Sequence, residues 1–217
     1  MKIGVIGYGL IGEELVRRII EKGWEVGPIV RTSGIFNLKG EKTDEPNNWL
    51  ASLLPVDIVC LCISTLDDGW IAYRYIDALV KNGKQVVTCE KGALGNYFPE
   101  LEPWMEKIGC SAAVGGGTRL LSWLRERLTP GTKEIHLIIN GTLNYIFDGL
   151  SKGRAQDEVI GEAKRLGYAE PGAQSALEVM NAESCKDVPM KTAVLLNTCG
   201  FGKIRAKNIN AQRISEM

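Results

Sequence analysis

The sequence lacks the features that mark several functional classes. It contains one histidine, His136, and no Cys-x-x-Cys pair, so the usual ligand spacing of a zinc site is absent. Lysine plus arginine and aspartate plus glutamate both number 26, and this balance indicates neither nucleic acid nor an anionic membrane as a partner. No apolar run approaches the length of a membrane span. We therefore expect no nucleic-acid partner and no membrane partner.

Six cysteines are present, and their surroundings indicate reduced thiols. Cys60 and Cys62 lie inside an apolar run, where cysteine behaves as a small hydrophobic residue. The chain opens directly with a strand-like segment, which leaves no room for a signal peptide. Both features predict a cytoplasmic protein, because free thiols are typical of a reducing compartment.

The first half alternates strand-like and helix-like segments. The whole chain of 217 residues suffices for one large domain or two small ones, and its 45% hydrophobic and 24% charged residues are ordinary for a globular protein. Apolar periodicity predicts strands at 2–6, 26–30, 58–63, 85–89 and 111–114, helices at 10–21, 47–54 and 70–82, and a helix that ends within 105–109. This succession predicts an α/β fold with a doubly wound parallel sheet.

The second half changes character near Pro130-Gly131, which marks a turn. We predict a dinucleotide-binding domain at 1–129 and a smaller α+β domain at 130–217. The expected elements around and after the boundary are helices at 120–128, 144–149 and 157–166 and a strand at 134–140.

The segment Gly7-Tyr8-Gly9-Leu10-Ile11-Gly12 follows the first strand and opens the first helix. In that position the pattern is typical of a dinucleotide site: Gly7 permits the tight turn, Gly9 lets the backbone meet the pyrophosphate, and Gly12 allows close helix–strand packing. The free N–H groups at the start of the helix would bind the phosphates. The alternative is a plain strand–helix junction that needs glycine only for packing.

The end of the second strand bears on which dinucleotide is bound. An NAD site commonly has an acid about twenty residues beyond the glycines, but this chain has Arg31-Thr32-Ser33 there. A guanidinium flanked by hydroxyls suits a 2′-phosphate, so we expect NADP, with NAD possible. The alternative is a solvated arginine at a strand end.

Several motifs in fixed order resemble the homoserine dehydrogenase family. They are the glycine motif, 90–94 (Glu-Lys-Gly-Ala-Leu), 113–117 (Ala-Val-Gly-Gly-Gly), 140–146 (Asn-Gly-Thr-Leu-Asn-Tyr-Ile), 167–170 (Gly-Tyr-Ala-Glu) and 187–191 (Asp-Val-Pro-Met-Lys). The likeness covers essentially the whole chain. It implies a Rossmann-type domain followed by a substrate and dimerisation domain, a homodimer, and the reversible NAD(P)-dependent interconversion of homoserine and aspartate 4-semialdehyde. Some members have a monovalent-cation site with a carboxylate where this chain has Ser111, so we expect no metal.

The resemblance also implies site residues. Lys191 and Lys91 match the family's site lysines, and a lysine suits the proton transfer that accompanies hydride transfer to or from a carbon–oxygen centre. The implied substrate-binding residues are Glu170, Asp187, Thr142, Asn144 and Gly117. The implied cofactor contacts are Gly7, Gly9, Leu10, Ile11, Gly12, Arg31, Thr32, Ser33, Ser64, Thr65 and Lys91.

Asp187 and Lys191 alone, at i and i+4 of a helix, also fit an ordinary surface ion pair. The chain departs from the family after Glu170, where residues 171–174 read Pro-Gly-Ala-Gln, and after the three glycines, where Thr118-Arg119 follow. Family members normally continue beyond the position of Met217, so we expect a shortened second domain. The alternatives are a non-catalytic dinucleotide-binding subunit or sensor, and a dehydrogenase of another small amino acid.

Overall fold

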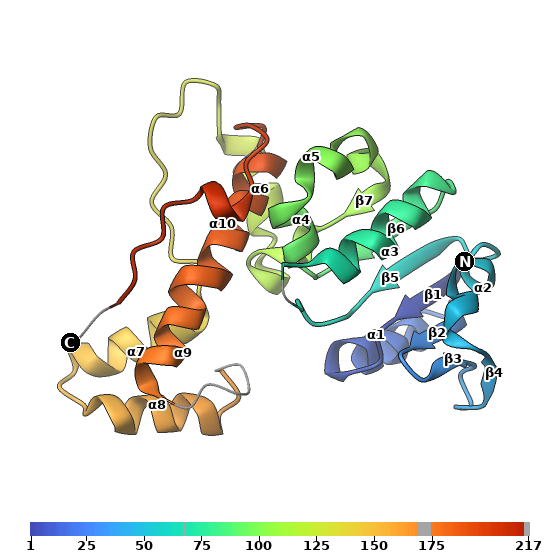
Figure 1. Cartoon of the computed structure of the whole chain (residues 1–217), viewed down its shortest axis with the longest axis horizontal. Coiled ribbons are helices and arrows are strands. Elements are labelled where there is room, and N and C mark those ends of the chain that lie inside the picture. Colours follow the sequence, from blue (N-terminus) through green and yellow to red (C-terminus); the bar gives the residue numbers. More distant parts are fainter. Residues whose placement is uncertain (67, 169–174, 215–217) are drawn as a thin grey trace.

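The computed structural model describes residues 1–66, 68–168 and 175–214 (Figure 1). A twisted sheet with flanking helices forms one part, and a group of helices, α7, α8 and α9, forms the other. The long helix that contains α10 runs between the two parts and packs against α4 and α6 of the sheet-containing part.

The sheet has seven strands in the order β4-β3-β2-β1-β5-β6-β7. Strands β1, β2, β5, β6 and β7 are parallel, whereas β3 and β4 form an antiparallel ribbon at one edge. The bounds are Lys2–Ile6 (β1), Glu25–Arg31 (β2), Gly34–Phe36 (β3), Lys42–Asp44 (β4), Ile58–Leu61 (β5), Gln85–Thr88 (β6) and Ile108–Gly109 (β7). The predicted α/β fold with a Rossmann-type parallel sheet is confirmed.

Ten α-helices occur in the described residues: Leu10–Glu21 (α1), Trp49–Leu53 (α2), Trp70–Lys81 (α3), Gly92–Asn96 (α4), Phe98–Leu101 (α5), Leu120–Arg127 (α6), Gly141–Ser151 (α7), Gln156–Arg165 (α8), Ala176–Ala182 (α9) and Val188–Thr198 (α10). A π-helical turn, Glu183–Asp187, joins α9 to α10 without a break. Such single π turns are often found at functional sites.

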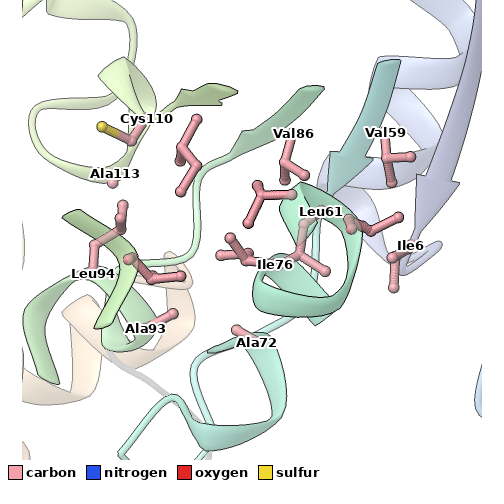
Figure 2. Packing of buried hydrophobic residues seen from close by; sticks show 14 of the residues in the cluster. Ile6, Val59, Leu61, Ala72, Ile76, Val86, Ala93, Leu94, Cys110 and Ala113 are labelled. Carbon is pink, nitrogen blue, oxygen red and sulfur yellow. The ribbon is translucent and has the colours of Figure 1, made fainter. Parts of the chain in front are cut away.

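The two faces of the sheet are covered unequally. Helix α1 packs Val16 and Ile19 on one face, against Ile3, Val5 and Ile29. The larger cluster lies on the other face, where Leu61 and Val86 of the sheet meet Ile76 and Leu79 of α3 (Figure 2). All four of these side chains are fully buried, and each such burial stabilises the fold by about 1.5–3 kcal/mol. The second cluster continues through Leu94 of α4 toward the helical part.

The strand predicted at 111–114 is wrong. The strand ends earlier, as β7, whose Ile108 and Gly109 pair with Val86 and Val87 of β6. Residues Ser111–Ala113 form a 3-10 turn instead. Ala113 and Val114 are nevertheless buried, so their apolar character reflects packing in the core rather than strand pairing.

The strand predicted at 134–140 is also wrong. Residues 132–140 are irregular, and no described segment pairs with them. An extended segment is stable as a strand only when a neighbouring strand takes up its N–H and C=O groups. Two of its apolar side chains remain open to solvent, with Ile138 81% and Leu137 39% exposed, whereas Ile139 packs against the core.

The β3–β4 ribbon was not predicted from the sequence. Its strands are three residues long, too short to show the alternation that marks a longer strand. Among the described residues, no helix combines the length and apolar character needed to cross a membrane.

Candidate active site

A cavity of about 610 Å³ opens between the start of α7, the π-helical turn and the start of α4. It is lined by residues from segments far apart in the sequence: Lys91, Asn140, Gly141, Thr142, Asn144, Tyr145, Asp148, Gly167, Tyr168, Glu183, Asp187 and Lys191. Five of the predicted site residues therefore share one cavity: Lys91, Thr142, Asn144, Asp187 and Lys191.

Asp187 lies between the two lysines. Its Oδ1 is 2.7 Å from Lys91 Nζ, and its Oδ2 is 2.6 Å from Lys191 Nζ. Burial opposes ionisation of the Asp187 carboxyl, but the hydrogen bonds from Lys191 and Lys91 outweigh it, and the pKa of Asp187 is lowered below its ordinary value. The carboxylate is therefore ionised at neutral pH and orients both ammonium groups.

Asn140 ties this arrangement to the start of α7. Its Oδ1 accepts the backbone N–H of Leu143 at 2.7 Å, which caps the helix. Its Nδ2 donates to Glu183 Oε2 at 2.5 Å and to Asp187 Oδ2 at 2.7 Å. All three polar side chains are buried, and burial without such partners would be costly.

The π-helical turn places two buried carboxylates on the cavity. Glu183 and Asp187 are four residues apart, at the two ends of the turn. Both side chains reach the same amide nitrogen of Asn140, so they lie on the same side of the helix.

A third buried carboxylate, Glu90, anchors the backbone next to Lys91. Glu90 Oε1 accepts the Thr65 hydroxyl and the Gly92 N–H, both at 2.6 Å, and Oε2 accepts the Ala93 N–H at 2.9 Å. These bonds satisfy free donors at the start of α4. They also connect the loop after β5, through Thr65, to the residue next to Lys91.

Next to these hydrogen bonds, the backbone of the loop after β5 crosses close to the backbone at the start of α4. Gly69 has φ +87°, and a Cβ added there would lie 2.2 Å from the carbonyl carbon of Gly92. Only glycine permits this approach of the loop after β5 to the start of α4.

Thr142 and Asn144 line the cavity differently. The Thr142 hydroxyl is already engaged, because it donates to the Tyr168 carbonyl oxygen at 2.6 Å. The Tyr145 and Tyr168 rings meet edge to face, with centroids 5.2 Å apart, on the same wall. The side chain of Asn144 is exposed and available to a ligand.

The glycine turn after β1 has the geometry of a phosphate cradle. Gly7 has φ +90°, and a Cβ at Gly12 would lie 2.1 Å from the Gly7 carbonyl oxygen, so helix and turn are in close contact. A Cβ at Gly9 would meet no atom within 4 Å, which leaves open space above the turn. The turn lies where β2 pairs with one side of β1 and β5 with the other. Ligands bind at such a switch in strand order.

Leu10 and Ile11 border this open space and are strongly exposed, at 90% and 59%. Arg31 ends β2, and its guanidinium carbon lies 4.6 Å from the Tyr8 ring centroid and 5.2 Å from that of Phe36. These contacts hold the guanidinium on the same side as the glycine turn. Thr32 and Ser33 follow in an exposed turn.

Some of the predicted site residues do not line the cavity. Gly117 lies in an exposed 3-10 turn, Gly116–Thr118, and is not among the residues that line the cavity. Ser64 is exposed in the loop after β5, and Glu170 lies outside the described residues.

The sequence analysis assigned no role to Asn140 or Glu90, and named no role for Glu183 in the cavity. Asn140 could have been found from its position, since asparagine before a helical segment is a typical N-cap. Within the described ranges, no group of three or more histidine, cysteine or acidic side chains is arranged to hold a metal ion.

Residues 122–217 match the family model of homoserine dehydrogenase. The homoserine dehydrogenase of Neisseria gonorrhoeae is 30% identical over 91% of this chain and 49% of the relative, and that of Synechocystis is 25% identical over 99% and 52%. The chain thus spans about half the length of these curated relatives.

Solved structures agree in fold. A homoserine dehydrogenase from Thiobacillus denitrificans has a TM-score of 0.74 at 26% identity, covering 99% of this chain and 52% of that one. The enzyme from Thermoplasma acidophilum has a TM-score of 0.77 at 20% identity, covering 100% and 74%. A hyperthermophilic archaeal homoserine dehydrogenase in complex with NADPH has a TM-score of 0.76 at 22% identity, covering 93% and 70%. The matches in sequence extend across the motifs that build both the glycine turn and the lysine-bearing cavity, and over this length the chain is similar to homoserine dehydrogenases.

Proposed function

We propose that this chain carries the nucleotide-binding and catalytic parts of an NADP-dependent homoserine dehydrogenase, an oxidoreductase of amino-acid biosynthesis. The observation that carries the proposal is the placement of Asp187 between Lys91 and Lys191 in one cavity. A surface ion pair would not need a third, distant partner or a buried carboxylate.

The reaction requires a proton to move together with a hydride. When homoserine is oxidised, its terminal carbon loses a hydride and the oxygen on that carbon loses a proton; reduction of aspartate 4-semialdehyde reverses both transfers. NADP, when bound, supplies the hydride exchange. Lys191, held by Asp187, gives the proton to the substrate oxygen on reduction and takes it on oxidation. Lys91, on the opposite oxygen of Asp187, stabilises negative charge on the same substrate oxygen.

The cavity offers complementary charge for a zwitterionic amino acid. Glu183 and Asp187 are buried acids on its wall, and either suits a substrate ammonium. Glu170 remains a predicted ligand of that ammonium. Asn144 presents an amide to the substrate, and the engaged hydroxyl of Thr142 shapes the wall rather than donating to a ligand.

The residues around the glycine turn fit a dinucleotide. The space next to Gly9 is open, since an added Cβ there would meet no atom within 4 Å, and a pyrophosphate needs such space at the start of the helix. Arg31, placed beside Tyr8 and Phe36, presents a permanent positive charge to a 2′-phosphate. An archaeal relative of the same fold binds NADPH, which supports NADP as the cofactor of this chain.

The decisive experiment replaces Lys191. We expect Lys191→Ala to lower kcat by roughly 10²–10⁴-fold, the usual contribution of a positioned general acid–base group, while NADPH affinity is kept. Turnover is followed by nicotinamide absorbance with homoserine and NADP, and binding by NADPH fluorescence. The control is Lys186→Ala, an exposed lysine on the π-helical turn. Wild-type protein that binds NADPH without turning over homoserine would indicate the non-catalytic alternative.

We also propose that the protein is a cytoplasmic homodimer. All six cysteines are free thiols, as in a reducing compartment. The exposed Ile138 and Leu137 lie in a segment with strand-forming composition but no described partner strand, and a second copy of the chain suits it. Light scattering on the wild type and on Ile138→Lys tests this: we expect a dimer that the lysine weakens.

A further inference from the structure

Three cysteines gather on one face of the sheet, outside the lysine-bearing cavity. Cys60 of β5 packs with Ile3 and Val5 on the face covered by α1, so Cys62, two residues further, points the same way. On β6, Val86 packs on the opposite face, which places Val87 and then Cys89 on the α1 side.

Cys62 and Cys89 are direct neighbours across the sheet. β5 and β6 are parallel, with Cys60 opposite Val87 and Leu61 opposite Thr88, so Cys62 and Cys89 are the next pair along. Neighbouring strands lie about 4.8 Å apart, within the roughly 4.4–6.8 Å that a disulfide needs between Cα atoms. The Cys89 side chain is directed toward β5, since its sulfur lies 4.0 Å from the Leu61 carbonyl oxygen, and the two thiols influence each other's pKa.

The two thiols differ in acidity. The S–H of Cys62 donates to the sulfur of Cys89, and this bond lowers the pKa of Cys89 to about 7 although burial opposes it. The same bond and burial raise the pKa of Cys62. Cys89 is therefore the thiolate of the pair at neutral pH, and a thiol whose pKa lies near the ambient pH attacks disulfides efficiently.

The pair is also partly accessible, in contrast to Cys60 and Cys110, which are buried. The α1 side of the sheet is open at β6, where Val87 is 45% exposed and Gln85 is exposed. Cys89 is half-buried on this open face. Cys60 is 7% exposed, and burial raises its pKa to about 11, so it is shielded from reagents in solution.

Cys62 is in contact with the glycine turn. Its backbone N–H donates to the Ile6 carbonyl oxygen at 2.7 Å. A Cβ added at Gly7 would lie 2.6 Å from the Cys62 carbonyl oxygen, and one at Gly12 would lie 3.7 Å from Cys62 Cβ. Any displacement of Cys62 toward Cys89 therefore acts directly on the backbone that would bind the pyrophosphate.

We propose that Cys62 and Cys89 form a redox-active dithiol, which small-molecule disulfides convert to an intramolecular disulfide that weakens dinucleotide binding at the adjacent glycine turn. The Cys89 thiolate attacks a disulfide RSSR, forming a mixed disulfide and releasing RS⁻. Cys62 sulfur then attacks the Cys89 sulfur of the mixed disulfide, losing its proton and releasing the second R group as RS⁻. The two cysteines lose two electrons and two protons in total, and RSSR becomes two RSH. The predicted weakening of dinucleotide binding rests on the proposed function, whereas the formation of the disulfide does not.

The chemistry is tested without any cofactor. Reduced protein is treated with oxidised glutathione, remaining thiols are alkylated with iodoacetamide, and intact mass and peptide mapping locate the modified cysteines. We expect the wild type to lose two alkylation sites, linked as Cys62–Cys89. Cys62→Ala should instead hold glutathione on Cys89, because the resolving thiol is gone. Cys199→Ala, which removes a cysteine distant from the pair, should react as the wild type does. A wild-type protein that keeps all its thiols, or links another pair, overturns the proposal.

The consequence is tested by NADPH fluorescence titration of the reduced and the bridged protein. We expect roughly tenfold weaker binding after bridging, reversed by dithiothreitol and absent in Cys89→Ala treated in the same way. Bridged protein that binds NADPH as tightly as reduced protein overturns the regulatory part. Failure of the reduced wild type to bind NADPH contradicts the proposed function instead, and the mass measurement still decides whether the disulfide forms.

Discussion

The side-chain amide of Asn140 donates a 2.7 Å hydrogen bond to the carboxylate of Asp187, 47 residues further along the chain. This bond joins the cap of α7 to the helix that bears the lysine. Asp187 thereby receives three donors, the amide and two ammonium groups. The cavity is held open by groups that satisfy one another rather than by apolar packing.

Replacement of Asp187 should remove part of the pH dependence of stability. In Asp187→Asn the two lysines lose their shared anion, and the free energy of unfolding should fall by roughly 3 kcal/mol near neutral pH. Because the folded-state pKa of Asp187 lies below its ordinary value of 3.8, the wild-type advantage is fully present above that value. It is lost as the pH falls through the lower, folded-state pKa.

Urea unfolding of both proteins across the acidic range measures this difference. The matched control is Asp148→Asn, an exposed acid of the same cavity whose pair with Lys152 is on the surface, and it should change stability by less than about 0.5 kcal/mol. A gap between wild type and Asp187→Asn that stayed constant into acid would contradict the assigned role of the ion pairs.

Cofactor preference should depend on Arg31. Arg31→Asp removes a charge-assisted hydrogen bond to the 2′-phosphate and places an acid where a ribose hydroxyl would be bound. We expect the ratio of kcat/KM for NADP over NAD to fall by about tenfold or more, since 1.4 kcal/mol corresponds to tenfold. Initial rates with both cofactors give the ratio. Lys39→Asp, an exposed cation beyond β3, should leave it unchanged, and equal ratios for all three proteins would remove Arg31 from the phosphate site.

The crossing of Gly69 over Gly92 should be sensitive to one methyl group. Gly69→Ala places a Cβ 2.2 Å from backbone, whereas Gly83→Ala, at a similar φ of +80°, meets nothing within 4 Å. Both substitutions cost about 1 kcal/mol in the left-handed region, and Gly69→Ala should cost roughly 2 kcal/mol more through the clash.

Thermal unfolding of the two variants isolates that difference. Gly69→Ala should also lower turnover, because the displaced segment carries Lys91. Equal losses of stability in the two variants would mean that the crossing relaxes without strain.

Local patterns were sufficient for the first strand and helix. β1 at Lys2–Ile6 and α1 at Leu10–Glu21 coincide with the segments predicted from apolar periodicity and the glycine stop. The failures are non-local: residues 134–140 have strand composition but no described partner, and Ala113 and Val114 are apolar because they are buried. The site shows the same division. Lys91 and Lys191 were predicted from motifs. The roles of Asn140 and Glu90 became visible only in the structure, where Asn140 donates to the distant Asp187 and Glu90 accepts the backbone N–H of Ala93.

The first strand and helix, the glycine turn and the residue types available for chemistry are determined by the sequence itself, because each depends on spacing within a few residues. Which side chains meet was decided only by the tertiary structure. The register of β5 against β6 makes Cys62 and Cys89 neighbours, and the docking of α10 on α4 brings Asp187 to Lys91. Such contacts depend on how separate elements pack, and no local pattern encodes the distance between them.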